Sequence, residues 1–189
     1  MQEAIVKYVK GESRINKMKL FVHGRSLGGA VAIYTVQQYP ELFRGMIIEN
    51  TFTSIEDMAD QLFFFARHVK QYILRNHWRS IDIVDQITLP ALYVTGDADE
   101  LVPFEMTQVL YQRSRNTKFK NIYVVKGGTH NDTWYVGGQR YLDKLEEFIW
   151  KALNAVKETS TDKQQVKNEQ SEQQDIKDQR ETVINTQEL

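Results

Sequence analysis

Cysteine is absent from the 189 residues, which excludes disulfide bonds, thiolate nucleophiles and cysteine-bound zinc. Neither sign of charge prevails, because 24 Lys and Arg stand against 25 Asp and Glu, and we therefore expect no nucleic acid partner. No segment approaches the roughly 20 consecutive apolar residues of a membrane span. Residues 1–11 indicate an amphipathic helix rather than a signal peptide. Any chemistry must therefore use hydroxyl, carboxylate or imidazole groups.

Aromatic residues are also missing from residue 154 to the C-terminus, where Gln, Lys, Glu and Asp dominate. So polar a segment buries too little surface to offset its ordering entropy, and we predict a disordered tail over residues 154–189. A solvated helix or weak coiled coil is the alternative, although the isolated Val166, Ile176 and Val183 form no sustained heptad. A single domain accounts for residues 1–153, in keeping with a usual domain size of roughly 100–200 residues.

The remainder of the chain alternates between strand-like and helix-like segments. Short apolar runs typical of buried parallel strands occupy residues 19–23, 45–49, 91–95 and 121–125. Helical patterns occupy residues 27–39, 103–114 and 139–153, the first ending at Pro40 and the second opening with Pro103. Strands that alternate with helices in this way predict right-handed crossovers, and hence an α/β fold with a doubly wound parallel sheet.

The connection over residues 52–89 is longer than one crossover needs. Thr53 and Glu56 fit a capping box, and apolar residues recur at helical spacing after them, so we predict a helical insertion. Its apolar face is widened by Phe63, Phe64 and Phe65. Over the carboxyl ends of the strands, such a helix would form a lid or a wall that binds an acyl chain. Plain packing against the core is the alternative.

A sharp turn surrounds Ser26. Residues 24–28 read GRSLG, which fits the G-x-S-x-G pattern of a nucleophile elbow, a strand–turn–helix arrangement that exposes the serine hydroxyl. A strand pattern precedes the turn and a helical pattern follows at once, as that arrangement requires. Small residues at positions 24, 28 and 29 would let the strand and helix backbones approach closely. The alternative is an ordinary glycine-rich turn.

A serine hydroxyl is a weak nucleophile that needs an imidazole base, and the sequence offers 4 histidines. His23 lies too close to the turn to fold back on Ser26, and His68 and His77 fall in the insertion with no motif around them. His130 directly follows the last predicted strand, in a glycine-containing loop before the final helix, which makes it the favoured base. A structural loop histidine is the alternative.

The segment VTGDADELVP, after the third predicted strand, offers Asp97, Asp99 and Glu100 as carboxylates to orient that base. We favour Asp99, because the spacing sets it on the turn after the glycine and ahead of the helix. Asp97 is the nearest rival, and Glu49 and Asp57 are more distant ones. The alternative role for any of them is a helix N-terminal charge or an Asx turn.

Four segments, GRSLGGAVAI, ENTFTSIEDMA, GDADELVP and GTHNDTW, resemble the α/β-hydrolase fold serine hydrolases, and most of all their single-domain, membrane-anchored members. The resemblance runs from about residue 15 to residue 150. It implies Ser26 as nucleophile, Asp99 as acid and His130 as base, in agreement with the choice made from the residues. It also implies that the backbone N–H of Leu27, the residue after the nucleophile, donates to the oxyanion hole.

Members of this family usually carry a membrane segment and several strands before the elbow, including the loop that donates a second oxyanion-hole amide. Because the sequence contains neither, we expect it to be a partial form of the domain, with one strand edge left unpaired. Membrane association is accordingly expected of longer members of the family, and this chain shows no anchor. The sequence leaves the oligomeric state open.

These features together predict a serine hydrolase that cleaves an ester or thioester with an apolar acyl chain through an acyl-enzyme. The substrate would be a small molecule or an acylated compound, and we expect no metal or organic cofactor. Peptidase activity on small substrates stays open. The alternative from another class is a non-catalytic α/β module that binds a partner through its insertion or tail. Nucleotide binding is disfavoured, because neither G-x-x-x-x-G-K-[ST] nor G-x-G-x-x-G is present.

Overall fold

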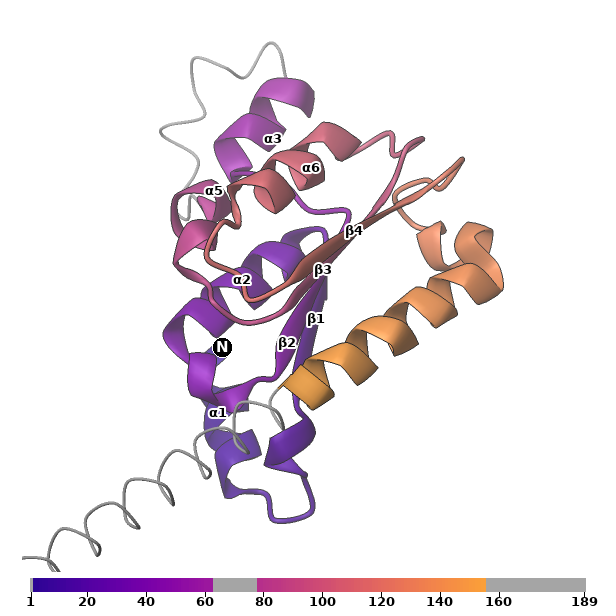
Figure 1. Ribbon diagram of the computed structural model, residues 1–189. Helices are drawn as coiled ribbons and strands as arrows, with labels where there is room; N and C mark the ends of the chain where they lie inside the picture. The colour runs from indigo at the N-terminus through magenta and orange to yellow at the C-terminus, as the bar shows by residue number, and fades with distance from the viewer. Residues whose placement is uncertain (1, 63–77, 156–189) are drawn as a thin grey trace, which may run out of the picture. The chain divides into compact units, whose positions relative to one another are not determined.

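The computed structural model describes residues 2–62 and 78–155 (Figure 1). The chain divides into two compact units, Met1–Ala152 and Leu153–Leu189, and only residues 153–155 of the second are described. From residue 156 onward the predicted tail lies outside the described residues, as do Phe63, Phe64, Phe65, His68 and His77. Within the described ranges, no helix combines the length and the apolar character that a bilayer crossing requires.

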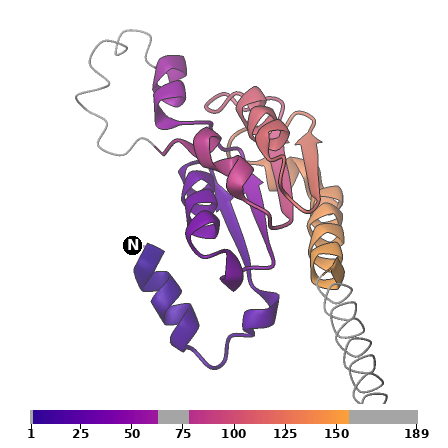
Figure 2. The same ribbon diagram turned by 60° about the vertical axis from the view of Figure 1, so that its left-hand side comes forward.

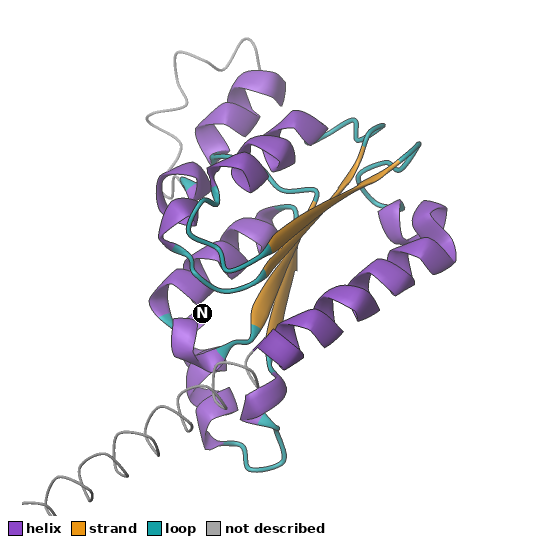
Figure 3. Ribbon diagram, in the orientation of Figure 1, coloured by secondary structure: helices purple, strands orange, loops and turns teal. Residues whose placement is uncertain are grey.

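Within the described residues, four parallel strands form the sheet (Figure 3). Their order across the sheet is β1-β2-β3-β4. They are β1 (Phe21–Arg25), β2 (Gly45–Glu49), β3 (Ala91–Gly96) and β4 (Lys120–Val125). Three of the four strands agree with the prediction to within one residue at each end. The strands β2 and β3 are buried along their whole length, which explains why their sequences are continuous apolar runs.

The strand β1 lies later in the sequence than the predicted residues 19–23. Its ladder with β2 runs from Phe21 opposite Gly45 to Arg25 opposite Glu49. Lys19 instead ends a short 3-10 helix, η1 (Lys17–Lys19). The side chain of the N-cap Asn16 accepts a hydrogen bond from the Met18 N–H at 3.0 Å and so stabilises this turn.

The helices are α1 (Gln2–Gly11), α2 (Leu27–Gln38), α3 (Ile55–Leu62), α5 (Ser80–Ile83), α6 (Phe104–Arg113) and a last helix over residues 133–155, with 3-10 turns η2 (Pro40–Leu42) and η4 (Val84–Gln86). The helices α2, α5 and α6 cover one face of the sheet, and the last helix covers the other (Figures 1 and 2). Helices on both faces confirm the predicted doubly wound α/β fold. Helical residues run from 133 to 155, but Gly138 has a left-handed φ of 51°, so a short helical segment precedes the helix predicted from residue 139.

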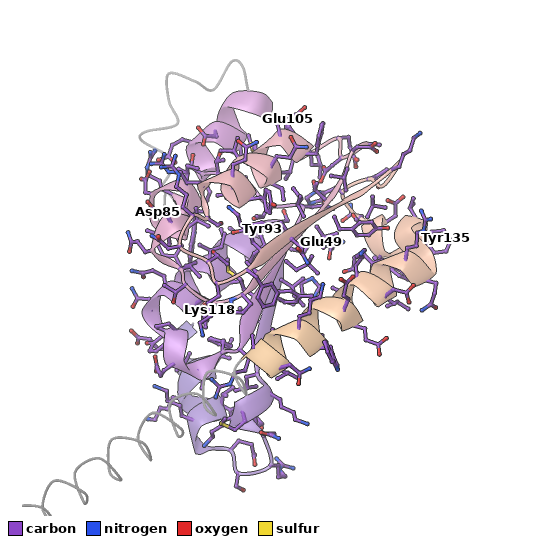
Figure 4. The ribbon with its side chains drawn as sticks, viewed as in Figure 1. Glu49, Asp85, Tyr93, Glu105, Lys118 and Tyr135 are labelled. Carbon is purple, nitrogen blue, oxygen red and sulfur yellow. The ribbon has the colours of Figure 1, made fainter. Side chains whose placement is uncertain are left out.

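Among the described residues, apolar clusters on both faces of the sheet hold the layers together. On one face, Ile33 of α2 packs with Ile48 of β2 and with Tyr93 of β3. On the other face, Phe148 of the last helix packs against the apolar side chains of β2 and β3. Figure 4 shows Tyr93 on the first face and Glu49 on the second, so the last helix covers a sheet face that also carries a carboxylate.

A helix does begin in the predicted insertion, but its cap is shifted by one residue. The N–H of Asp57 donates to Ser54 Oγ at 3.0 Å, which makes Ser54 the N-cap of α3. Thr53 Oγ1 donates to Asp57 Oδ2 at 2.5 Å. The predicted capping box of Thr53 and Glu56 is therefore wrong, because the serine one position further on occupies the cap.

Candidate active site

Ser26 stands at the turn between β1 and α2, where its backbone takes φ 53° and ψ −125°. This conformation is strained for any residue with a side chain. The Ser26 N–H donates to the Glu49 carbonyl at 3.0 Å, while its own carbonyl accepts from Thr51 Oγ1 at 2.6 Å and from the Gly29 N–H at 2.9 Å. Backbone hydrogen bonds on both sides therefore hold a half-buried serine in a strained strand-to-helix elbow.

The close approach of strand and helix at this elbow requires two of the three small residues singled out in the sequence. A Cβ atom on Gly24 would lie 2.1 Å from the carbonyl oxygen of Gly28, and one on Gly29 would lie 2.5 Å from Thr51 Oγ1. Around Gly28 itself a Cβ atom would meet nothing within 4 Å. The expectation that Gly28 is small for steric reasons is wrong, because it is the backbone of Gly28 that fills the space beside Gly24.

Asp99 and His130 form a buried pair between the loops that follow β3 and β4. The Nδ1 atom of His130 lies 2.9 Å from Asp99 Oδ2 and 3.1 Å from Oδ1. The side chains are 8% and 0% exposed, for His130 and Asp99 respectively. The carboxylate is itself fixed, because Oδ1 accepts the N–H groups of Leu101 at 2.9 Å and Val102 at 2.8 Å. The ring therefore uses Nδ1 for the carboxylate and keeps Nε2 for another partner.

The rival carboxylates have other partners. Asp97 Oδ1 accepts the Gly127 N–H at 2.5 Å, and Asp57 Oδ2 accepts from the hydroxyl of Thr53, the residue before the N-cap of α3. Glu100 Oε2 accepts the backbone N–H of His130 at 3.4 Å rather than a ring nitrogen. Among the described residues, Asp99 is thus the carboxylate that contacts the His130 ring.

Glu49, the remaining rival, is buried and belongs to a separate cluster under the last helix. Its Oε2 atom accepts from the Tyr141 hydroxyl at 2.8 Å and lies 3.1 Å from His23 Nε2. Burial, and then the neighbouring carboxylate, raise the pKa of the Tyr141 phenol above its usual range. His23 therefore contacts Glu49 on the face of the sheet under the last helix.

Ser26 and the Asp99–His130 pair lie at the same edge of the sheet. Ser26 follows β1, Asp99 follows β3 and His130 follows β4, and all four strands are parallel. Arg25 Nη1 donates across this edge to the Asn131 carbonyl at 3.4 Å. Within the described residues, no hydrogen bond joins the Ser26 hydroxyl to the His130 ring. Serine, imidazole and carboxylate at one edge form a set that can perform acyl transfer, and such contacts often tighten only when substrate binds.

The sequence profile of the prolyl oligopeptidase family matches residues 2–155. The chain belongs to this family. Its α/β-hydrolase character, expected from the four quoted segments, is confirmed by the relatives.

Over 161 residues the chain is 32% identical to the α/β-hydrolase domain-containing protein WAV2 of Arabidopsis thaliana. This alignment covers 79% of this chain and 52% of WAV2. Over 148 residues it is 31% identical to protein bem46 of Schizosaccharomyces pombe, covering 78% of this chain and 48% of bem46. The chain thus spans about half the length of these curated relatives.

Solved structures agree on the fold. Est1E from Butyrivibrio proteoclasticus superimposes with a TM-score of 0.62 at 19% identity, over 80% of this chain and 68% of Est1E. The monoacylglycerol lipase of Paleococcus ferrophilus gives a TM-score of 0.57 at 18% identity, over 80% of this chain and 74% of the lipase. At such identities the likeness shows the α/β-hydrolase fold alone.

Sequence reasoning missed one polar residue of this edge, Asn50. Its side chain is fully buried and its backbone takes φ 44° directly after β2. A polar residue that tolerates a left-handed backbone at the end of an apolar strand was the available signal. That signal indicates a turn, and the distant partners of the side chain are visible only in the folded chain.

Proposed function

We propose that this chain carries the nucleophile, base and acid of a serine hydrolase, namely Ser26, His130 and Asp99. The contact of 2.9 Å between Asp99 and His130 is the observation that carries the proposal, because it leaves Nε2 of the ring for a serine hydroxyl. The strained elbow at Ser26, on the same edge of the sheet, supports it. Membership of a family of α/β hydrolases supports hydrolysis as the reaction class.

In the first half of the reaction, Ser26 Oγ attacks the carbonyl carbon of the acyl group while His130 Nε2 takes the hydroxyl proton. The bond to the leaving oxygen or sulfur then breaks, and His130 gives that atom the proton. Asp99 holds the Nδ1 proton and stabilises the imidazolium that forms in between. The products of this half are the free alcohol or thiol and an acyl-enzyme at Ser26.

Water completes the reaction by attacking the acyl carbon. His130 takes a proton from the water and returns it to Ser26 Oγ, which releases the carboxylic acid. The negative charge of each tetrahedral intermediate needs donors in place. Leu27 is the first residue of α2, so its N–H has no acceptor within the helix, and we assign it to the oxyanion.

An ester or thioester with an apolar acyl chain is the proposed substrate. Leu27 and Leu101, next to the elbow and the acid loop, are 50% and 39% exposed and leave apolar surface near the proposed catalytic residues. The wall of Phe63, Phe64 and Phe65 stays a prediction, since these residues are outside the described ranges. One relative, YNL320W of Saccharomyces cerevisiae, is named a membrane protein, and membrane association of longer members also stays a prediction.

A peptide bond is the second candidate, because the family is that of prolyl oligopeptidase. Ester hydrolysis and peptide hydrolysis differ in the leaving group, and the same proposed catalytic residues would serve both. Turnover of p-nitrophenyl esters of increasing acyl length should be compared with that of acylated amino acid p-nitroanilides. An apolar acyl pocket should raise kcat/KM by up to roughly fourfold for each CH2 group that it buries. Turnover of the anilides alone would favour the peptidase.

Labelling with a fluorophosphonate tests the proposal directly. The chain should be labelled, and both Ser26→Ala and His130→Ala should abolish labelling. His23→Ala is the matched control, because His23 also contacts a carboxylate but in the Glu49 cluster. It should be labelled like the parent. A folded chain that is never labelled, or labelling that depends on His23 instead of His130, would favour the non-catalytic binding module.

A further inference from the structure

Asn50 stands where the backbone ladder between β2 and β3 ends. Its N–H donates to the Val94 carbonyl at 3.0 Å, and its left-handed φ of 44° then turns the chain out of the strand. Asparagine tolerates this conformation better than most residues with a side chain. The side chain is fully buried, although an amide is costly to bury without partners.

The Asn50 amide is satisfied on both ends. Its Oδ1 accepts the N–H of Gly96 at 3.0 Å. Its Nδ2 donates to Thr133 Oγ1 at 2.7 Å, and lies 3.1 Å from the His130 carbonyl and 3.3 Å from that of Thr129. Because a backbone N–H can only donate and a carbonyl can only accept, these partners fix which end of the amide is oxygen.

These partners lie at the roots of two different loops. Gly96 is the last residue of β3 and leads into the turn that carries Asp99, whereas Thr129 and His130 form the loop after β4. The two loops also pack backbone to backbone, since a Cβ atom on Gly96 would lie 2.1 Å from the Gly128 carbonyl oxygen. One side chain from β2 therefore links the loop of the proposed acid to the loop of the proposed base.

We propose that Asn50 is a positioning residue for the Asp99–His130 pair. It holds the backbone of His130 itself, through the carbonyl, and the start of the Asp99 turn, through the Gly96 N–H. The separation of the two side chains is thereby set from a third strand rather than by their own contact alone. This inference rests on the proposed function for its catalytic meaning, but the geometry that it concerns can be measured without turnover.

The bridge needs the chemistry of asparagine. Aspartate has the same shape but would turn an oxygen toward the carbonyls of Thr129 and His130. Alanine would keep the strained φ and lose all of the side-chain bonds. Glycine removes the amide and is at ease with a positive φ, so Asn50→Gly isolates the contribution of the amide from that of the backbone turn.

The test compares Asn50→Gly with Ser114→Ala in the full chain. Ser114 is also fully buried, and its hydroxyl bonds with Tyr93 at the end of α6, away from the loops of Asp99 and His130. Both variants lose buried hydrogen bonds and should lower Tm. Two readouts are followed in each, namely the proton NMR resonance of His130 Nδ1–H, which needs the Asp99 contact, and the rate of fluorophosphonate labelling.

Asn50→Gly should broaden or abolish the His130 Nδ1–H resonance and slow labelling by roughly 10- to 100-fold, the size of effect that a misplacement of about 1 Å produces. Ser114→Ala should retain both. Thr133→Val, which removes the acceptor of the shortest amide bond, should act in the same direction as Asn50→Gly and carries the test if the latter does not fold.

An Asn50→Gly variant that keeps the resonance and the labelling rate of Ser114→Ala would overturn the inference. The inference would also be overturned if both variants lost resonance intensity and labelling rate to the same extent for a given decrease in Tm. A different result would contradict the proposed function without deciding the role of Asn50. If the parent chain shows the resonance but is never labelled, Ser26 is not a working nucleophile, and the resonance alone then decides whether Asn50 positions the pair.

Discussion

The Asp99 carboxylate holds the His130 ring in one orientation. Its Oδ2 lies 2.9 Å from Nδ1, while Oδ1 accepts the backbone amides of Leu101 and Val102 at 2.9 and 2.8 Å. A carboxylate only accepts, so Nδ1 carries the proton and Nε2 is left free to accept one. The attachment of Asp99 to its own turn therefore fixes the tautomer of the ring as well as its place.

Asp99→Asn should slow labelling at Ser26 by roughly 10³- to 10⁴-fold. The amide can still accept the two backbone N–H groups through its oxygen, but its NH2 group then faces the ring and forces the other tautomer. Asp97→Asn is the matched control, since its oxygen can still accept the Gly127 N–H and it lies away from the ring. Equal losses in the two variants would contradict the assignment of Asp99.

Ser26→Gly should stabilise the fold while it abolishes labelling. Glycine adopts φ 53° and ψ −125° without the strain that serine bears, and relief of one such residue is worth about 1 kcal/mol or more. Urea unfolding of the two chains measures the difference. Ser26→Ala keeps the strained backbone and should show no such gain. A Ser26→Gly chain no more stable than Ser26→Ala would mean that the elbow is not strained.

The strands could be predicted from the sequence where apolar runs have sharp ends. Residues 45–49 are bounded by a glycine and a glutamate, and the observed β2 has those bounds. The strand β1 could not be placed as well, because its ladder continues through Gly24 and Arg25, which are not apolar. Pairing with β2 decides that end, and pairing is a tertiary contact that hydrophobicity does not record.

The candidate site divides in the same way. The pairing of Asp99 with His130 was predictable, because each follows an apolar strand and parallel strands bring their carboxyl ends to one edge. The linkage by Asn50 was not, since its partners are 46 and 80 residues away in the chain. The Ser54 cap was missed for a local reason, because two adjacent hydroxyl residues compete for the same position.

Gly24→Ala and Gly28→Ala should have opposite effects on stability. At Gly24 the new methyl group would lie 2.1 Å from the Gly28 carbonyl oxygen, so the strand and helix must separate, at about 1–3 kcal/mol or more. At Gly28 the methyl group meets nothing within 4 Å, and alanine is favoured over glycine in a helix by about 1 kcal/mol. Thermal unfolding of both variants measures this, and a destabilised Gly28→Ala chain would contradict it.

Tyr141 ties the last helix to the sheet through a buried carboxylate. Its hydroxyl donates to Glu49 at 2.8 Å, and that carboxylate also has His23 at 3.1 Å. Burial first, and then the Glu49 charge, raise the pKa of the phenol above its ordinary value of 10.0. The folded chain thus holds the phenolic proton more tightly than the unfolded chain does, which links its stability to alkaline pH.

Tyr141→Phe should destabilise the chain by about 1–3 kcal/mol at neutral pH, because Glu49 loses its hydroxyl donor while it remains buried. The raised pKa of Tyr141 makes its contribution complete below pH 10.0 and progressively lost as the pH rises through the folded-state pKa. The difference in unfolding free energy between parent and variant should therefore narrow as the pH rises above 10.0. Burial also raises the pKa of Tyr93. Tyr93 is present in both chains, so its contribution to the pH dependence cancels in the difference. Urea unfolding below and above pH 10.0 measures this difference in unfolding free energy. A difference that stays constant or widens as the pH rises would show that the phenol is not held in its neutral form.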